Sequence, residues 1–306
     1  MLLRYSRITL LLFSIALLSC EDKIHPELQS AKAILVVDGW LNNKPEAQYI
    51  ILTQTQPYFD NVIPSGVSGA LVTVTSNKGN VFTFNEDQIN PGRYKWNAPT
   101  KSLFGIVGDT YTLNISLNGE TFQSKSRMGR VPVIDSLTYD SDKRIGSKDS
   151  LTRGQFWSTD PLGPGDAYWI RAYKNKVLLS KPSEINIAYD GGLNPGGDAD
   201  GVIFITPVRR KINSRDVDDS GKQLSPIVPG DSLNVQIHSI TQEAFNYLTQ
   251  VITQTDRPGG FQELFSRPLA NVSTNISNTN KSGSSVVGFF NVSAVSQLGK
   301  KYVKKK

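Results

Sequence analysis

Cysteine, histidine and methionine are the rarest residues in this 306-residue chain, which contains one Cys, two His and two Met. His25 falls in a polar stretch near the N-terminus and His238 at the end of an expected strand. Neither a His-based catalytic triad nor a motif with two His ligands is therefore available. The sequence also has no G-x-S-x-G nucleophile elbow and no phosphate-binding P-loop. We expect a protein that is not an enzyme and has no cofactor.

Long hydrophobic runs are scarce as well, because only the first one stands out. The apolar segment Ile8–Leu18 follows Arg4 and Arg7, which is the order of charge and apolar residues in an export signal. It is shorter than the roughly 20 residues needed to span a bilayer. No later run approaches that length, so we expect the rest of the chain to be water-soluble apart from any lipid.

The end of this segment holds the only cysteine. A secretory cleavage site has small residues at the first and third positions before the cut, but Leu17 occupies the third position here. Leu17-Leu18-Ser19-Cys20 resembles the lipobox of bacterial lipoproteins. The resemblance implies that residues 1–19 are removed and that Cys20 is acylated, which anchors the protein to a membrane and leaves no thiol for other chemistry. The alternative is a soluble secreted protein with a chance cysteine.

Residues 20–32 are polar, contain one proline and show no hydrophobic period, which is typical of a tether. Glu21 and Asp22 follow the cysteine directly. Such an acidic pair resembles the signal that sends Bacteroidota lipoproteins to the outer face of the outer membrane. The alternative is that the two carboxylates only keep the tether soluble.

Charge and size bound the function and the number of domains. The net charge of +6 comes from 33 basic and 27 acidic residues that are interleaved along the chain. No basic stripe with stacking aromatic residues is present, so we expect no nucleic-acid partner. The chain is longer than a single hydrophobic core usually supports, which favours two domains.

Residues 33–130 predict an immunoglobulin-like β-sandwich. Short runs rich in β-branched and aromatic residues alternate with turns of Asn, Gly, Pro and Asp, at the spacing of about seven strands. Along residues 111–117, Tyr111, Leu113 and Ile115 share one face, as expected of a half-buried strand. Asn118-Gly119, directly after it, is a strong hairpin signal.

Residues 131–306 predict a second β-rich domain with one amphipathic helix. Pro132 interrupts the strand pattern at the boundary. Further strands are expected, among them a short one at 202–205 and a closing one at 286–295. The helix is expected at about residues 240–255, with Ser239 as its N-cap and Gln242 completing a capping box.

One aromatic group is the candidate ligand-binding site. Trp169, Arg171 and Tyr173 alternate along an expected strand and therefore share a face. Aromatic rings on such a face can stack on a ligand such as a sugar ring. The competing interpretation is that these rings fill the core.

Acidic turns are the candidate metal sites. Residues 216–221 imitate the first half of a calcium loop, and a glycine-rich segment offers Asp190, Asn194, Asp198 and Asp200. Neither segment has a Glu at the twelfth position of an EF-hand loop, so we interpret both as plain turns and predict no metal site. A hydrolase built on two carboxylates is kept as a third hypothesis, which a structure without close acidic residues in a cleft would end.

Three Asp-Ser-Leu tripeptides match the short O-glycosylation motif of exported Bacteroidota proteins. They place candidate modified serines at Ser136, Ser150 and Ser232. A motif this short also arises by chance.

The mature chain as a whole resembles an uncharacterised family of Bacteroidota outer-membrane lipoproteins whose genes often lie beside those of TonB-dependent receptors. The segments that carry the resemblance are Leu35–Trp40, Gln56–Phe59, Val67–Ala70, Pro182–Asp190, Gln254–Phe261 and Pro268–Asn271. It implies a location and a partner, a TonB-dependent receptor, but no chemistry. We therefore expect an accessory or ligand-capture component of a nutrient transporter; the alternative is a structural or adhesive envelope protein without a small ligand.

Overall fold

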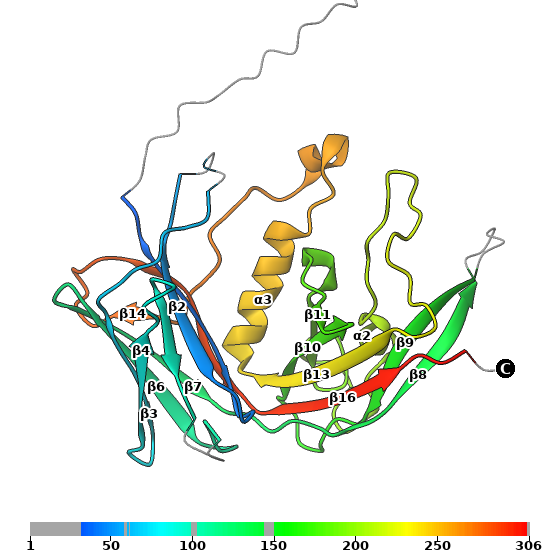
Figure 1. Cartoon of the computed structure of the whole chain (residues 1–306), viewed down its shortest axis with the longest axis horizontal. Helices are drawn as coiled ribbons and strands as arrows, with labels where there is room; N and C mark the ends of the chain where they lie inside the picture. Colours follow the sequence, from blue (N-terminus) through cyan, green and yellow to red (C-terminus); the bar gives the residue numbers. More distant parts are fainter. Residues whose placement is uncertain (1–31, 58–59, 61, 99–102, 144–149, 305–306) are drawn as a thin grey trace, which may run out of the picture. The chain divides into compact units, whose positions relative to one another are not determined.

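The chain is mainly β with few helices, which confirms the fold class expected from the sequence. The computed structural model describes residues 32–57, 60, 62–98, 103–143 and 150–304. Within them the strands group into sheets of nine, five and two strands (Figure 1). Ala33–Lys306 form one compact unit.

The nine-stranded sheet contains the first seven strands of the described chain together with two strands from its C-terminal part. In spatial order its strands are β14 (Ser277–Asn278), β7 (Glu120–Arg127), β6 (Thr110–Leu117), β3 (Leu71–Ser76), β4 (Val81–Glu86), β5 (Arg93–Trp96), β2 (Gln48–Gln54), β1 (Leu35–Asn42) and β15 (Val286–Ser293). The expected strands between residues 33 and 130 are thus present. The Asn118-Gly119 hairpin joins β6 to β7 with φ of 50° and 79°, as a type I′ turn requires.

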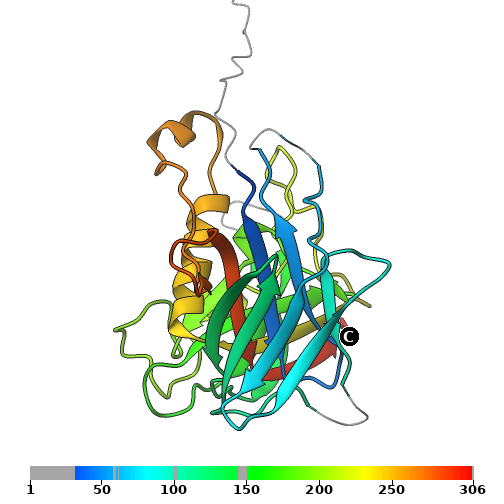
Figure 2. The same ribbon diagram turned by 90° about the vertical axis from the view of Figure 1, so that its left-hand side faces the viewer.

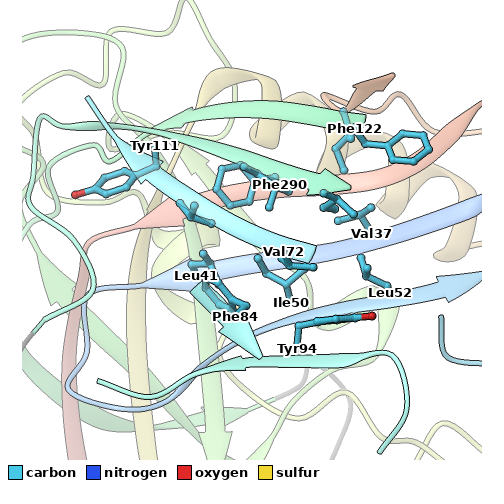
Figure 3. Close-up of a cluster of buried hydrophobic side chains, with 14 of the residues drawn as sticks. Val37, Leu41, Ile50, Leu52, Val72, Phe84, Tyr94, Tyr111, Phe122 and Phe290 are labelled. Atoms are coloured by element: carbon cyan, nitrogen blue, oxygen red, sulfur yellow. The ribbon is translucent and has the colours of Figure 1, made fainter. Parts of the chain in front are cut away.

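The sheet curls around an apolar core. Tyr111, Leu113 and Ile115 are buried on one face of β6, as the alternation predicted, and they pack with side chains from both ends of the sheet (Figure 3). Near the two ends, β15 lies against β7, where Val292 N donates to Ser126 Oγ at 2.9 Å. The strands form one hydrogen-bonded path, and the immunoglobulin-like arrangement itself stays a prediction.

Strand β15 comes from the far end of the sequence and pairs with β1 in parallel. The register runs from Leu35 opposite Val286 to Asn42 opposite Ser293. Strands from beyond residue 131 therefore complete a sheet that begins at residue 35. The boundary near residue 130 stays a prediction, because the described chain is continuous across it.

The remaining strands enclose a second apolar core. The five-stranded sheet contains β11 (Val177–Leu178), β10 (Ala167–Lys174), β13 (Ser232–Ile240), β16 (Val295–Lys301) and β12 (Asn186–Tyr189), and a ribbon of β8 (Ile134–Lys143) and β9 (Ser150–Ser158) packs beside it. The buried face of the five-stranded sheet carries Tyr168, Ile170, Val235 and Ile237. The prediction of a short strand at 202–205 was wrong. Within that segment only Ile203 forms a β-bridge, and helix α2 (Thr206–Arg210) begins directly after residue 205.

Helix α3 (Gln242–Thr255) confirms the expected helix, but its N-cap is Thr241 and not Ser239. Strand β13 continues through Ile240, so Ser239 is still paired in the sheet and its Oγ accepts from Ala294 N at 2.9 Å. Two short 3-10 helices, η1 (Pro182–Glu184) and η2 (Gly260–Phe265), were not expected. In the described part of the chain, every helix is too short or too polar to cross a bilayer.

Gly288 permits the parallel pairing of β15 with β1, and its substitution tests that pairing. Its φ is +99°, and a Cβ there would lie 2.0 Å from the carbonyl oxygen of Val37. We expect Gly288→Ala to lower the free energy of unfolding by about 2–4 kcal/mol, measured by urea denaturation. The matched control is Gly79→Ala, which has a similar φ of +84° but open space around it. The control should cost about 1 kcal/mol, and equal losses at both glycines would contradict this account.

Candidate functional site

The structure brings Trp169, Arg171 and Tyr173 together on one face of β10, as the sequence predicted. All three are half-buried. The Arg171 guanidinium lies 4.8 Å from the centre of the Trp169 ring and 5.9 Å from that of Tyr173. Cation–π attraction at these distances holds the guanidinium between the two rings.

Strand β1 supplies two neighbours that the sequence analysis missed, Trp40 and Asp38. The ring centres of Trp40 and Trp169 are 5.0 Å apart in an edge-to-face arrangement. Trp40 also stacks on Phe289 at 5.6 Å. The signal available in the sequence was the outer face of β1, where an acidic and an aromatic side chain alternate with the buried Val37 and Leu41.

Asp38 is close enough to Arg171 for their charges to interact. Its side chain reaches solvent, but surrounding protein atoms displace enough water to raise the pKa of its carboxyl group. The positive charge of Arg171 opposes this effect. In the part of the chain that the structure describes, Asp38 forms no hydrogen bond or close ion pair.

Arg171 also has no polar partner among the described residues. Its Nε is buried without a hydrogen-bond partner, and no described residue forms an ion pair with its guanidinium. An Arg side chain carries five N–H donors in a planar fork, which suits carboxylate, phosphate or hydroxyl acceptors. The face therefore offers unused donors on Arg171, an unused acceptor on Asp38, and aromatic rings.

Beside these residues, on the same face of the sheet, lies a polar row in which His238 and Gln236 of β13 are buried and Gln297 of β16 is exposed. His238 Nε2 is 3.1 Å from Gln236 Oε1, and Gln236 Nε2 donates to Gln297 Oε1 at 3.1 Å. Burial, with smaller contributions from Arg171 and Lys44, lowers the pKa of His238 to about 3. His238 is consequently a neutral imidazole at physiological pH, and it is suited to fixing Gln236 and not to exchanging protons.

A second candidate site is an acidic pocket of about 910 Å³ beside the turn that follows β12. Carboxylate oxygens of Asp160, Asp190 and Asp200 lie within 4.8 Å of one another. The sequence had singled out Asp190 and Asp200, but it gave no signal for Asp160, which lies 30 residues before Asp190. These three carboxylates are the group of described residues that could hold a cation.

The same carboxylates already hold the surrounding loops. Asp190 Oδ1 accepts from Gly165 N and Asp166 N, both at 2.9 Å. Asp160 accepts from Tyr168 Oη at 2.7 Å and from Gly201 N at 3.1 Å. Burial raises the pKa of Asp160, although these hydrogen bonds oppose the shift. Asp190 and Asp200 line the pocket and Asp160 is buried beside it, and each of the three carboxylates accepts from a loop amide.

The other candidate residues are scattered. Ser136 is half-buried in β8, and Ser232 is half-buried at the start of β13, where its amide donates to Asn175 Oδ1 at 2.9 Å. Ser150 begins β9. Cys20 lies outside the described residues.

The fold and these surfaces define a mainly β protein with an aromatic, arginine-containing face and an acidic pocket. Residues 21–298 match the family described as a domain of unknown function, DUF4249, so the chain belongs to that family. No curated protein matches the chain in a sequence comparison.

The lowered pKa of His238 predicts a pH dependence of stability. The unfolded histidine has a pKa of 6.5 and the folded one of about 3. Between these pH values the imidazole is protonated in the unfolded protein but not in the folded one. The free energy of unfolding of the protein should therefore fall as the pH drops below about 6.5. His238→Gln should flatten that part of the curve, measured by urea denaturation from pH 7 to about 4. A His238 imidazole, assigned by its loss in His238→Gln, that titrates near pH 6.5 by NMR would contradict the prediction.

Asp190 tests whether the acidic pocket is a set of turns. Asp190→Ala should lower the free energy of unfolding by about 1–3 kcal/mol, because two amides lose their acceptor. Asp190→Asn keeps an acceptor oxygen and tolerates the φ of 49°, so the loss should be smaller. If these are plain turns, millimolar calcium will not shift the melting temperature. A calcium-dependent rise in wild type that Asp190→Asn abolishes would instead identify a cation site.

Proposed function

We propose that this protein is a surface-exposed outer-membrane lipoprotein that acts as an accessory or ligand-capture component of a TonB-dependent nutrient transporter. The lipobox-like Leu17-Leu18-Ser19-Cys20 and the acidic pair that follows it support the location. The sequence resemblance to lipoproteins encoded beside such receptors supports the partner. The face around Arg171 supports the capture of a ligand.

The observation that carries the ligand-capture role is the unpaired guanidinium of Arg171 between two aromatic rings. Because the Arg171 side chain is only half-buried and no described residue forms a hydrogen bond or ion pair with it, its guanidinium can donate to an acceptor that approaches from solvent. A ligand with a ring and an acceptor group satisfies both features, because it can stack on Trp169 and accept hydrogen bonds from Arg171. The carboxylate of Asp38 would accept from a hydroxyl or amine of the same ligand.

The side chains that form this face are preorganised by packing against one another before any ligand binds. Trp40 and Trp169 contact each other, and Phe289 and Tyr247 pack behind Trp40 with ring centres 5.6 and 6.2 Å away. Rigid aromatic side chains lose little conformational entropy when a ligand binds. The face therefore needs no large rearrangement to accept one.

Arg171→Lys tests the proposal, because lysine keeps the charge but loses the planar fork and the stacking. In a strain that lacks the chromosomal gene, wild type should restore growth on the affected nutrient. Arg171→Lys should remain in the outer membrane but reduce uptake about tenfold or more.

The matched control is Arg209→Lys. Arg209 stacks on Trp157 at 3.9 Å, so it resembles Arg171 in its contact with an indole ring. It packs against β9 of the two-stranded ribbon and not against the face that carries Arg171, and Arg209 Nη2 donates to Thr206 Oγ1 at 3.2 Å. This variant should transport normally. Equal defects in the two variants would show that the loss at Arg171 reflects stability and not ligand binding.

A pull-down from outer membranes tests the partner. The lipoprotein should recover a TonB-dependent receptor, and its recovery without any such receptor would count against the proposal. If deletion of the gene changes adhesion or envelope integrity but growth on no nutrient, the alternative of a structural or adhesive lipoprotein is favoured.

The acidic pocket is the observation that favours a second candidate, a carboxylate-based hydrolase. Asp160 and Asp190 are close, and Asp160 has a raised pKa as a general acid requires. Their engagement with backbone amides argues for a structural role. Hydrolysis of a glycan or ester substrate that Asp160→Asn abolishes in a folded variant would establish this candidate.

A further inference from the structure

Several of the largest exposed apolar side chains lie in the segment after α3. Phe261 and Phe265 of η2 are 76 % and 79 % exposed, and Leu269 is 55 % exposed. The two Phe rings contact each other edge to face, with centres 5.6 Å apart. Apolar side chains of this size normally turn toward a core, so their common exposure needs a physical reason.

Polar contacts hold this segment in place while its rings face outward. Arg257 binds Glu263 and donates to the carbonyl oxygen of Arg267 at 2.8 Å. The backbone is also fastened to α3, because Ala270 N donates to Gln254 Oε1 at 2.9 Å. The exposure of the rings is therefore built into a braced segment.

A second exposed apolar pair belongs to the connection between β2 and β3. Val62 is 65 % exposed and Ile63 is 93 % exposed. Gln56 braces this connection by donating to the carbonyl oxygen of Val62 at 2.9 Å. In both views the described part of this connection and η2 project at the same end of the compact unit (Figures 1 and 2).

The described chain also begins at this end. Ile34 N donates to Thr55 Oγ1, and Thr55 N donates to the carbonyl oxygen of Ile34, both at 2.9 Å, so the start of β1 is fixed beside the connection after β2. Ala33 follows Cys20 by 13 residues, which span at most about 45 Å when fully extended. If Cys20 is acylated, as the proposed function requires, this end of the molecule stays within that distance of a bilayer.

We propose that this end is a membrane-contacting surface, in which Phe261 and Phe265, together with Val62 and Ile63, enter the boundary between the headgroups and acyl chains of a lipid bilayer. The inference rests on the lipid anchor of the proposed function. Exposed aromatic and aliphatic side chains gain from leaving water at such a boundary. Contact here would turn the opposite end, which carries the β3–β4 hairpin, away from the membrane (Figure 1).

The test uses the full-length lipoprotein with a polarity-sensitive fluorophore on a new cysteine. Cys20 is the only cysteine in the chain, and acylation blocks its thiol, so Phe265→Cys gives a single reactive site. The matched control is Val81→Cys, because Val81 is 62 % exposed at the start of β4, beside that hairpin. Both proteins are reconstituted in vesicles of phosphatidylethanolamine and phosphatidylglycerol.

We expect the probe at position 265 to shift to shorter wavelength on reconstitution and to lose intensity when spin-labelled lipid is added. The probe at position 81 should show neither change. A probe at 265 that reports water in the reconstituted protein would overturn the proposal. A shift at 265 that requires the receptor and is absent in lipid alone would also overturn it, and it would indicate a protein partner.

The same experiment separates failure of the anchor from failure of the surface. If Cys20 is not acylated, wild-type protein itself will react with the fluorophore, which contradicts the proposed function. If wild type does not react and the probe at 265 still reports water, the anchor stands and the membrane-contacting surface does not.

Discussion

The parallel pairing of β1 with β15 is the interaction on which the rest of the structure depends. It joins two segments about 250 residues apart through eight matched positions. Within β15, Asn291 Oδ1 accepts from Thr241 N at 3.1 Å, and directly after β15, Ala294 N donates to Ser239 Oγ. The nine-stranded sheet, the end of β13 and the start of α3 are thereby fixed to one strand.

The aromatic face follows from this pairing. Asp38 and Trp40 occupy the outer face of β1, opposite Phe289 and Asn291 in the register with β15. Because β15 is also tied to β13, the neighbour of β10, Trp40 meets Trp169 at 5.0 Å. A change at the β1–β15 seam should thus reach the proposed ligand face, although Arg171 itself lies on another sheet.

Local patterns predicted the individual elements well, because alternation and turn chemistry act over a few residues. The half-buried strand β6, the Asn118-Gly119 hairpin and helix α3 are examples. The N-cap was wrong because Ser239 has a suitable side chain but is needed in β13, so tertiary pairing overrides the local capping signal. The parallel partner of β1 could not be predicted, since nothing near residue 35 indicates a strand that follows residue 285.

The same limit applies to the site. Trp169, Arg171 and Tyr173 share a strand, so their common face followed from the period of two residues. Trp40 and Asp38 approach them only through long-range pairing. Likewise, Asp190 and Asp200 belong to one loop, whereas Asp160 reaches them from the end of a different segment. Sequence spacing thus identified the members of each cluster that share one strand or loop, and it could not supply the residues that long-range pairing brings to them.

The most direct measurement of the central claim, ligand capture at the aromatic face, is arginine-selective footprinting with phenylglyoxal followed by mass spectrometry. Intact cells grown on a complete medium would be compared with the washed, purified lipoprotein. The account predicts that Arg171 is protected in cells and modified in the purified protein, while Arg209 reacts equally in both. Equal modification of Arg171 in the two states would contradict it.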